Sequence, residues 1–214
     1  MGENEKISSY QKIDYSVRPA KSIERKMICE VISKLLILEK INNYRYVGFG
    51  SVFFTDFILL HKTFGFNSMI SIEKNTQDMQ RFKFNKPYSC IDLRFGTSNE
   101  VLPEINWDRP VILWLDYDSK IREGVFNDIG IFCTKAATHS IIIITVNATS
   151  DNPKYQSQEP GKIAGELAKE RLKSLKKKVG NNRIPLDTTG NDLDNLNNHK
   201  VLRKIILNEI MEDI

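Results

Sequence analysis

The sequence YRYVGFGS at residues 44–51 decides the fold class of this chain. A short apolar run breaks there at Gly48-x-Gly50 and leads into the apolar, helix-length segment 52–63. A strand that turns through glycines into a helix lets the backbone approach a ligand and points free N–H groups at it. A second apolar run ends in Glu73, and a carboxylate at a strand tip can accept both hydroxyls of a ribose. Together the two features predict a site for a nucleotide-type cofactor.

Apolar runs and helix-like segments alternate along the chain. We expect strands at 44–48, 68–73, 88–93, 111–116 and 140–147. We expect helices between them at 52–63, 76–85, 98–105 and 120–137. The last two strands are almost continuously apolar, as is typical of parallel strands covered on both faces. The pattern therefore predicts an α/β fold with a doubly wound, mostly parallel, Rossmann-like sheet in a three-layer α/β/α arrangement.

The flanks of this alternating region differ from it. Residues 1–17 are polar and are expected to form a flexible arm, after which a long amphipathic helix begins near Pro19. We expect residues 18–179 to form the Rossmann-like core and residues 180–214 to form a polar loop and a final helix. The final segment shows no convincing pair of strands.

Composition favours an ordinary globular protein. Of 214 residues, 41% are hydrophobic and 27% charged, and the net charge is only +4. The absence of a membrane-length apolar stretch and of a signal-like N-terminus favours the cytoplasm and no membrane partner. The basic, helix-compatible segment Lys169–Lys178 could contact nucleic-acid phosphates, although a solvated helix face is the interpretation we favour. An oligomer or a protein partner stays open.

The sequence LDYDS at residues 115–119 is the second candidate site. It places two carboxylates and a phenol where a buried strand ends, which is where open α/β sheets bind ligands. Asp116 or Asp118 could act as a general base, and Tyr117 could contact a substrate. Alternatively, Asp118 or Ser119 could have a structural role as the cap of the helix expected at 120–137. Ser98 could likewise cap the helix expected at 98–105. No third acidic ligand is evident from spacing, so we expect no metal.

These residues together resemble the class I S-adenosylmethionine-dependent methyltransferases over about residues 40–150. The segments Arg18-Pro19-Ala20-Lys21, Gly48–Ser51 and Leu115–Asp118 are also similar to bacterial proteins described as O-methyltransferases. The resemblance implies S-adenosylmethionine as the cofactor and methyl transfer, with oxygen of an unidentified molecule as the expected acceptor.

The resemblance also implies roles for individual positions. Glu73 would bind the ribose, and Asp116 would face the methyl group and the substrate. In the resemblance the segment that leads into the first helix often closes over cofactor or substrate, so Arg18 and Lys21 could contact an anionic substrate. The remaining cofactor contacts would come from the first and third strand ends: Gly48, Phe49, Gly50, Ser51, Phe95, Gly96 and Thr97.

Two positions depart from the family pattern. Tyr46 stands where the family usually has an acid, and Val52 stands where it often has a third glycine. Without that acid, another group such as Asp116 would have to pair with the cationic amino group of the cofactor. A non-catalytic nucleotide-fold module in a larger complex therefore remains an alternative. The lysine-rich segment Lys169–Lys178 also leaves open a methyltransferase that modifies nucleic acids.

Overall fold

The computed structural model describes residues 19–35, 37, 39–151 and 160–213. The chain divides into two compact units. The first comprises the described residues up to Leu115 together with 136–143, and the second comprises 116–135 and the described residues from 144 onward. In the described part, no helix is both long and apolar enough to cross a membrane.

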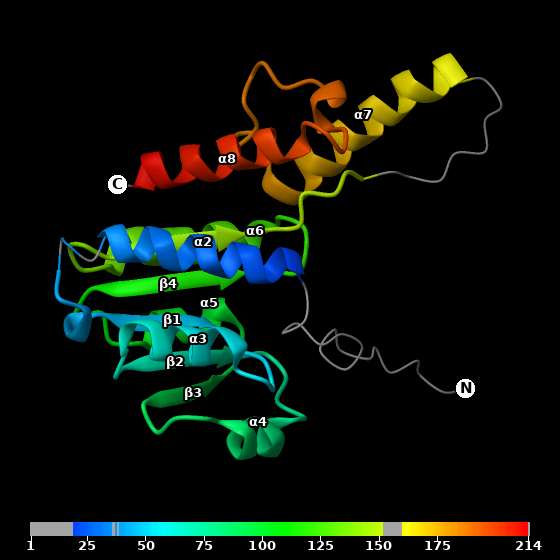
Figure 1. The fold of residues 1–214 in the computed structure, drawn as a ribbon. Coiled ribbons are helices and arrows are strands. Elements are labelled where there is room, and N and C mark those ends of the chain that lie inside the picture. The colour runs from blue at the N-terminus through cyan, green and yellow to red at the C-terminus, as the bar shows by residue number, and fades with distance from the viewer. Residues whose placement is uncertain (1–18, 36, 38, 152–159, 214) are drawn as a thin grey trace, which may run out of the picture. The chain divides into compact units, whose positions relative to one another are not determined.

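The strands form one five-stranded sheet in the order β3-β2-β1-β4-β5. Their bounds are β1 Arg45–Phe49, β2 Met69–Glu73, β3 Ile91–Phe95, β4 Val111–Asp116 and β5 Ile141–Thr145. The pairs β1–β2, β1–β4 and β2–β3 are parallel. Figure 1 shows β4, β1, β2 and β3 stacked in this order. Because the strand order reverses direction at β1, the predicted doubly wound, Rossmann-like sheet is confirmed.

Helices separate the strands along the chain, as expected. They are α2 Pro19–Leu35, α3 Thr55–Phe64, α4 Met79–Asn85, α5 Ser98–Val101, α6 Glu123–Lys135, α7 Pro160–Val179 and α8 Asn198–Asp213. Short 3-10 turns lie at Ile41–Asn43 (η2), Leu102–Glu104 (η3) and Gly190–Leu193 (η4). The described part of the chain after β5 contains no strand, in agreement with the sequence pattern.

The core of the first unit is strongly aromatic. Tyr46 on β1 lies edge-on to Phe57 of α3, with ring centroids 5.0 Å apart, and both side chains are buried. Phe54 and Phe82 extend the cluster in further edge-to-face contacts. Rings in such contacts bury large apolar areas, so they fix α3 and α4 against the sheet and thereby position the strand ends.

The turn after β1 is longer than the sequence pattern predicts. Helix α3 begins at Thr55 rather than at residue 52, and Phe54 precedes it in the left-handed conformation with φ 49°. A left-handed residue cannot continue a helix, and burial of the Phe54 ring offsets the strain of about 1–3 kcal/mol that such a residue carries. The backbone N–H of Phe54 donates to the carbonyl of Ser51 and closes the turn.

Three other boundaries correct the sequence expectations. Strand β3 begins at Ile91 rather than 88, because the N–H of Ile91 donates back to Tyr88 and forms a turn there. Thr97, not Ser98, caps α5, through a capping box with Glu100. Helix α6 begins at Glu123, so neither Asp118 nor Ser119 caps it.

Candidate cofactor site at the strand ends

The ends of β1, β2 and β3 lie side by side in the first unit. Phe49 pairs with Ile72, and Glu73 pairs with Phe95. The N–H of Gly50 donates to the carbonyl of Ile72, and the N–H of Gly96 donates to that of Glu73. The predicted glycine turn and the predicted ribose acid are therefore brought together at one edge of the sheet.

The Glu73 side chain points at the glycine turn. A Cβ atom built on Gly50 would lie 1.9 Å from Oε1 of Glu73 and 2.1 Å from Oγ of Ser71. Real Cβ atoms do not approach other atoms so closely, so only glycine at position 50 leaves this space for the carboxylate. The close packing of Glu73 against Gly50 explains why the second position of the Gly48-x-Gly50 motif is a glycine.

Burial dominates the chemistry of Glu73. Its side chain is 3% exposed, and the fully buried Ser71 donates a hydrogen bond of 2.7 Å to Oε1. Burial raises the pKa of Glu73 from 4.5 to about 7, although the Ser71 hydrogen bond acts in the opposite direction. The carboxyl group is thus poised to change charge near neutral pH. Its oxygens can accept ribose hydroxyls once they turn from Ser71 toward the ligand.

Ser71 was not singled out from the sequence, although a signal for it exists. In the strand MISIE the only polar residues are Ser71 and Glu73, which are two apart and therefore share a face. Polar residues at that spacing in an otherwise buried strand indicate a side-chain hydrogen bond.

The first glycine has a different role. Gly48 lies inside β1, paired with Ser71 on one side and Trp114 on the other. A Cβ there would lie 2.5 Å from the hydroxyl of Tyr46 and 3.1 Å from the carbonyl oxygen of Trp114. Gly48 thus allows close packing within the sheet.

The other cofactor candidates lie at the same sheet edge with local partners. Phe49 is the last residue of β1, and the Oγ atom of Ser51 accepts the N–H of Phe53 within the turn. Phe95 packs edge-on to Phe82, with centroids 6.2 Å apart. Gly96 has φ 149°, a conformation that favours glycine. Thr97 is occupied by its capping box, so its side chain has a structural role.

The predicted catalytic residues open the second unit. Asp116 ends β4 and is half-buried, whereas Asp118 is exposed. The hydroxyl of Tyr117 donates to the carboxylate of Asp128, which is fully buried on α6. The Tyr117 hydroxyl, predicted to contact substrate, is thus engaged with α6.

The sequence analysis also predicted that Arg18 and Lys21 contact substrate and that the site holds no metal. Arg18 lies outside the described residues. Lys21 forms an ion pair of 2.9 Å with Glu24, one turn along α2. Among the residues described, no group of three or more His, Cys, Asp or Glu side chains could hold a metal ion.

Helix α7 carries the predicted basic segment. Lys169, Lys173, Lys176 and Lys177 are exposed, but Lys178 turns inward to Asp151. Contact with nucleic acid through the exposed lysines stays a prediction. The inward position of Lys178 follows from helical spacing, since Leu175 and Val179 on the same side of α7 are buried.

A lysine pair around Asp151 is a feature that the sequence analysis did not find. Lys120 and Lys178 both donate to the carboxylate of Asp151, and Ser174 adds a hydrogen bond of 2.6 Å. Burial acts to raise the pKa of Asp151, but the three hydrogen bonds outweigh it and hold the pKa well below 3.8. The carboxylate therefore stays ionised at neutral pH and joins α7 to the loops after β4 and β5.

Replacing Asp151 by Asn should destabilise the protein by about 2 kcal/mol at pH 7, because two half-buried ammoniums lose their shared carboxylate. The folded-state pKa lies below the unfolded one, so this stabilisation is present above pH 4 and fades as the pH falls. Urea unfolding at pH 7 and pH 3 measures it. Asp187→Asn, which alters an exposed ion pair with Lys204, is the control. Equal midpoints for Asp151→Asn and wild type at pH 7 would contradict the expectation.

The doubly wound parallel sheet, with an acid ending its second strand beside a glycine turn, defines a Rossmann-like α/β protein of the methyltransferase type. The family described as "Putative O-methyltransferase" matches residues 13–214. The chain belongs to this family, which confirms the resemblance seen in the sequence. No curated protein matches it.

Two solved structures show a distant likeness. Both are of a mutant of MtNAS, one of them in complex with S-adenosylmethionine, and each is 13% identical with a TM-score of 0.38. The alignments cover 62% and 56% of this chain. They cover 50% and 44% of the solved chains, so this chain spans about half the length of those proteins.

Proposed function

We propose that this protein is an S-adenosylmethionine-dependent methyltransferase that transfers the methyl group to an oxygen atom of its acceptor. The observation that supports this most is the approach of the Glu73 carboxylate to Gly50 at the shared edge of β1 and β2. Membership of a family described by O-methyl transfer supports the reaction class.

The residues at this edge fit the cofactor. A carboxylate that turns away from Ser71 offers two acceptor oxygens to the two ribose hydroxyls, and hydrogen bonds to ionised acceptors are the stronger ones. The turn at Gly50 keeps the backbone side of the site free of a Cβ atom. When bound, the cofactor supplies an electrophilic methyl group. The protein must then orient an acceptor oxygen and accept its proton, for which Asp116 is the proposed base.

Calorimetric titration with S-adenosylmethionine and with its demethylated product tests the cofactor assignment. We expect both to bind with dissociation constants below the millimolar range, because the proposed ribose acid Glu73 lies beside a turn at which Gly50 carries no Cβ atom. Gly50→Val should lose this binding, since its side chain would occupy the space of the Glu73 carboxylate. Gly165→Val, on α7 where a Cβ meets nothing within 4 Å, is the matched control. Absence of binding at millimolar cofactor would instead favour a non-catalytic module.

A further inference from the structure

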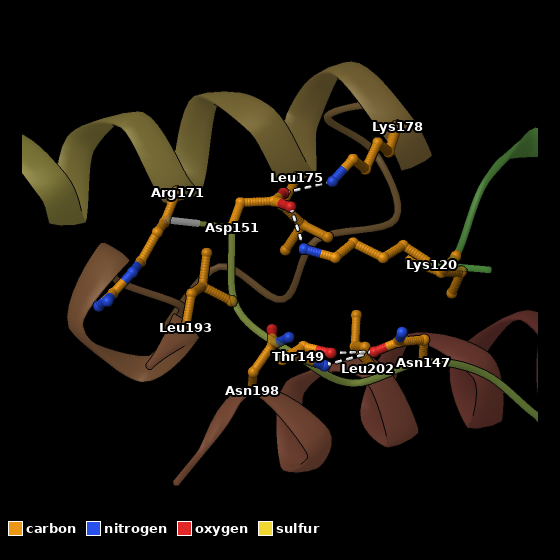
Figure 2. A pocket seen from close by; sticks show the side chains of 11 residues that line it. Lys120, Asn147, Thr149, Asp151, Arg171, Leu175, Lys178, Leu193, Asn198 and Leu202 are labelled. Carbon is orange, nitrogen blue, oxygen red and sulfur yellow. Dashed lines mark hydrogen bonds and ion pairs between the residues drawn. The ribbon is translucent and has the colours of Figure 1, made fainter. Parts of the chain in front are cut away.

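A small polar pocket lies within the second unit. Its enclosed volume is about 20 Å³, which holds a group the size of one water molecule, and it opens to solvent. Figure 2 shows side chains from α7, α8 and two loops around it. Its polar lining residues include Lys120, Asn147, Thr149, Asp151, Arg171 and Lys178.

The lining carries an excess of positive charge. Lys120 and Lys178 contribute two cations, and Asp151 contributes one carboxylate, so these three groups carry a net charge of +1. The hydrogen bonds around Asp151 keep it ionised, so the two lysines remain charged partners of an anion. Positive charge that the protein compensates only in part attracts an anionic ligand.

The two lysines also retain hydrogen-bond donors. An ammonium group has three N–H donors. Within the described residues, Lys178 donates to Asp151, and Lys120 donates to Asp151 and to the carbonyl of Ser150, at 3.1 Å. Both ammoniums can therefore donate to a further oxygen atom, whereas Thr149 and Asn198 already bind loop atoms.

The pocket lies on loops that follow strand ends. Lys120 comes shortly after β4, and the segment Asn147–Asp151 follows β5. Ligands of open α/β sheets bind outside the carboxyl ends of the strands, so these loops are expected substrate-binding elements. Because the enclosed space admits only one small group, a terminal oxygen fits and a whole substrate does not.

We propose that this pocket binds one terminal oxygen of the anionic head group of a small acid, a carboxylate or a phosphate, through Lys120 and Lys178. The assignment of that acid as the methyl acceptor rests on the proposed function, whereas the anion site itself does not. An acceptor held by its charged end leaves a hydroxyl elsewhere on the molecule free to receive the methyl group.

Thermal unfolding of the full chain in inorganic phosphate and in acetate, each against sodium chloride at equal ionic strength, tests the anion site. We expect at least one of the two anions to raise the melting temperature with a saturable dose response. Lys178→Gln should weaken the apparent affinity at least tenfold. Lys176→Gln, which changes an exposed lysine on the same helix, should leave it unchanged. Comparison of the two salts separates a phosphate from a carboxylate head group.

Equal melting temperatures in all three salts would overturn the proposal, as would identical anion responses of Lys178→Gln and wild type. If Lys178→Gln does not fold, Lys120→Gln provides the same comparison, because Lys120 reaches the same carboxylate from a different loop. Titration of Lys178→Gln with S-adenosylmethionine separates the two hypotheses. If Lys178→Gln still binds the cofactor but no longer responds to anions, the effect of the substitution lies at the pocket. If the wild type does not bind the cofactor, that result counts only against the proposed function.

Discussion

Glu73→Gln is expected to stabilise the folded protein by about 3 kcal/mol at pH 8 and to leave its stability almost unchanged at pH 4. Burial raises the folded-state pKa of Glu73 from 4.5 to about 7. In the wild type, stability therefore falls as the pH rises from 4.5 through 7, because the folded state must release a proton that the unfolded state has already lost. The glutamine side chain keeps a neutral amide at every pH and removes this cost.

Urea unfolding of wild type and variant from pH 4 to pH 9 measures the effect. Glu104→Gln, at an exposed position in the turn after α5, is the control and should change the free energy of unfolding by less than about 0.5 kcal/mol. A constant difference between Glu73→Gln and wild type across this pH range would show that Glu73 titrates normally in the folded protein.

The same substitution should have the opposite effect on function. An amide offers one acceptor oxygen and a donor NH₂ group, so the glutamine side chain of Glu73→Gln cannot accept both ribose hydroxyls. We expect S-adenosylmethionine to bind at least tenfold more weakly to a more stable protein. Such a combination of gained stability and lost affinity is typical of a residue retained for binding rather than for folding.

The sequence predicted the sheet because its signals are local. Continuous apolar runs such as 111–115 indicate buried strands when they are short and bounded by turn residues. The observed strands overlap every expected range. The start of α3 was predicted wrongly because side-chain packing decides it. The left-handed Phe54 is held by Phe57 and Phe82, and no property of the sequence around residue 52 shows that packing.

The sequence also predicted only part of the candidate site. The proximity of Gly50 and Glu73 follows from strand order, because parallel neighbours end at the same edge of the sheet. The burial of Glu73 and its bond to Ser71 depend on side-chain orientation, which periodicity only suggests. The cluster around Asp151 joins residues that are 23 to 31 positions from it, in a loop and a helix, where spacing carries no signal.

Asp116→Asn is expected to weaken S-adenosylmethionine binding about 30-fold, with little effect on methylthioadenosine, which lacks the amino-acid part of the cofactor. Tyr46 occupies the position of the acid that usually pairs with the cofactor amino group, and its buried ring contacts Phe57, so it brings no charge to the site. Asp116 is the half-buried carboxylate that ends β4, the strand beside β1. Loss of a charged hydrogen-bond partner costs about 1.5–3 kcal/mol, from which the expected change follows.

Calorimetric titration of both ligands distinguishes the two carboxylates by the part of the cofactor each one binds. Glu73→Gln should weaken both ligands, since both contain ribose, whereas Asp116→Asn should weaken only the ligand with an amino group. Asp118→Asn is the control, because Asp118 is exposed and should leave both affinities within about twofold. Equal losses of both ligands in Asp116→Asn would assign that carboxylate to the nucleoside. If neither affinity changes, the cofactor amino group must pair with a residue other than Asp116.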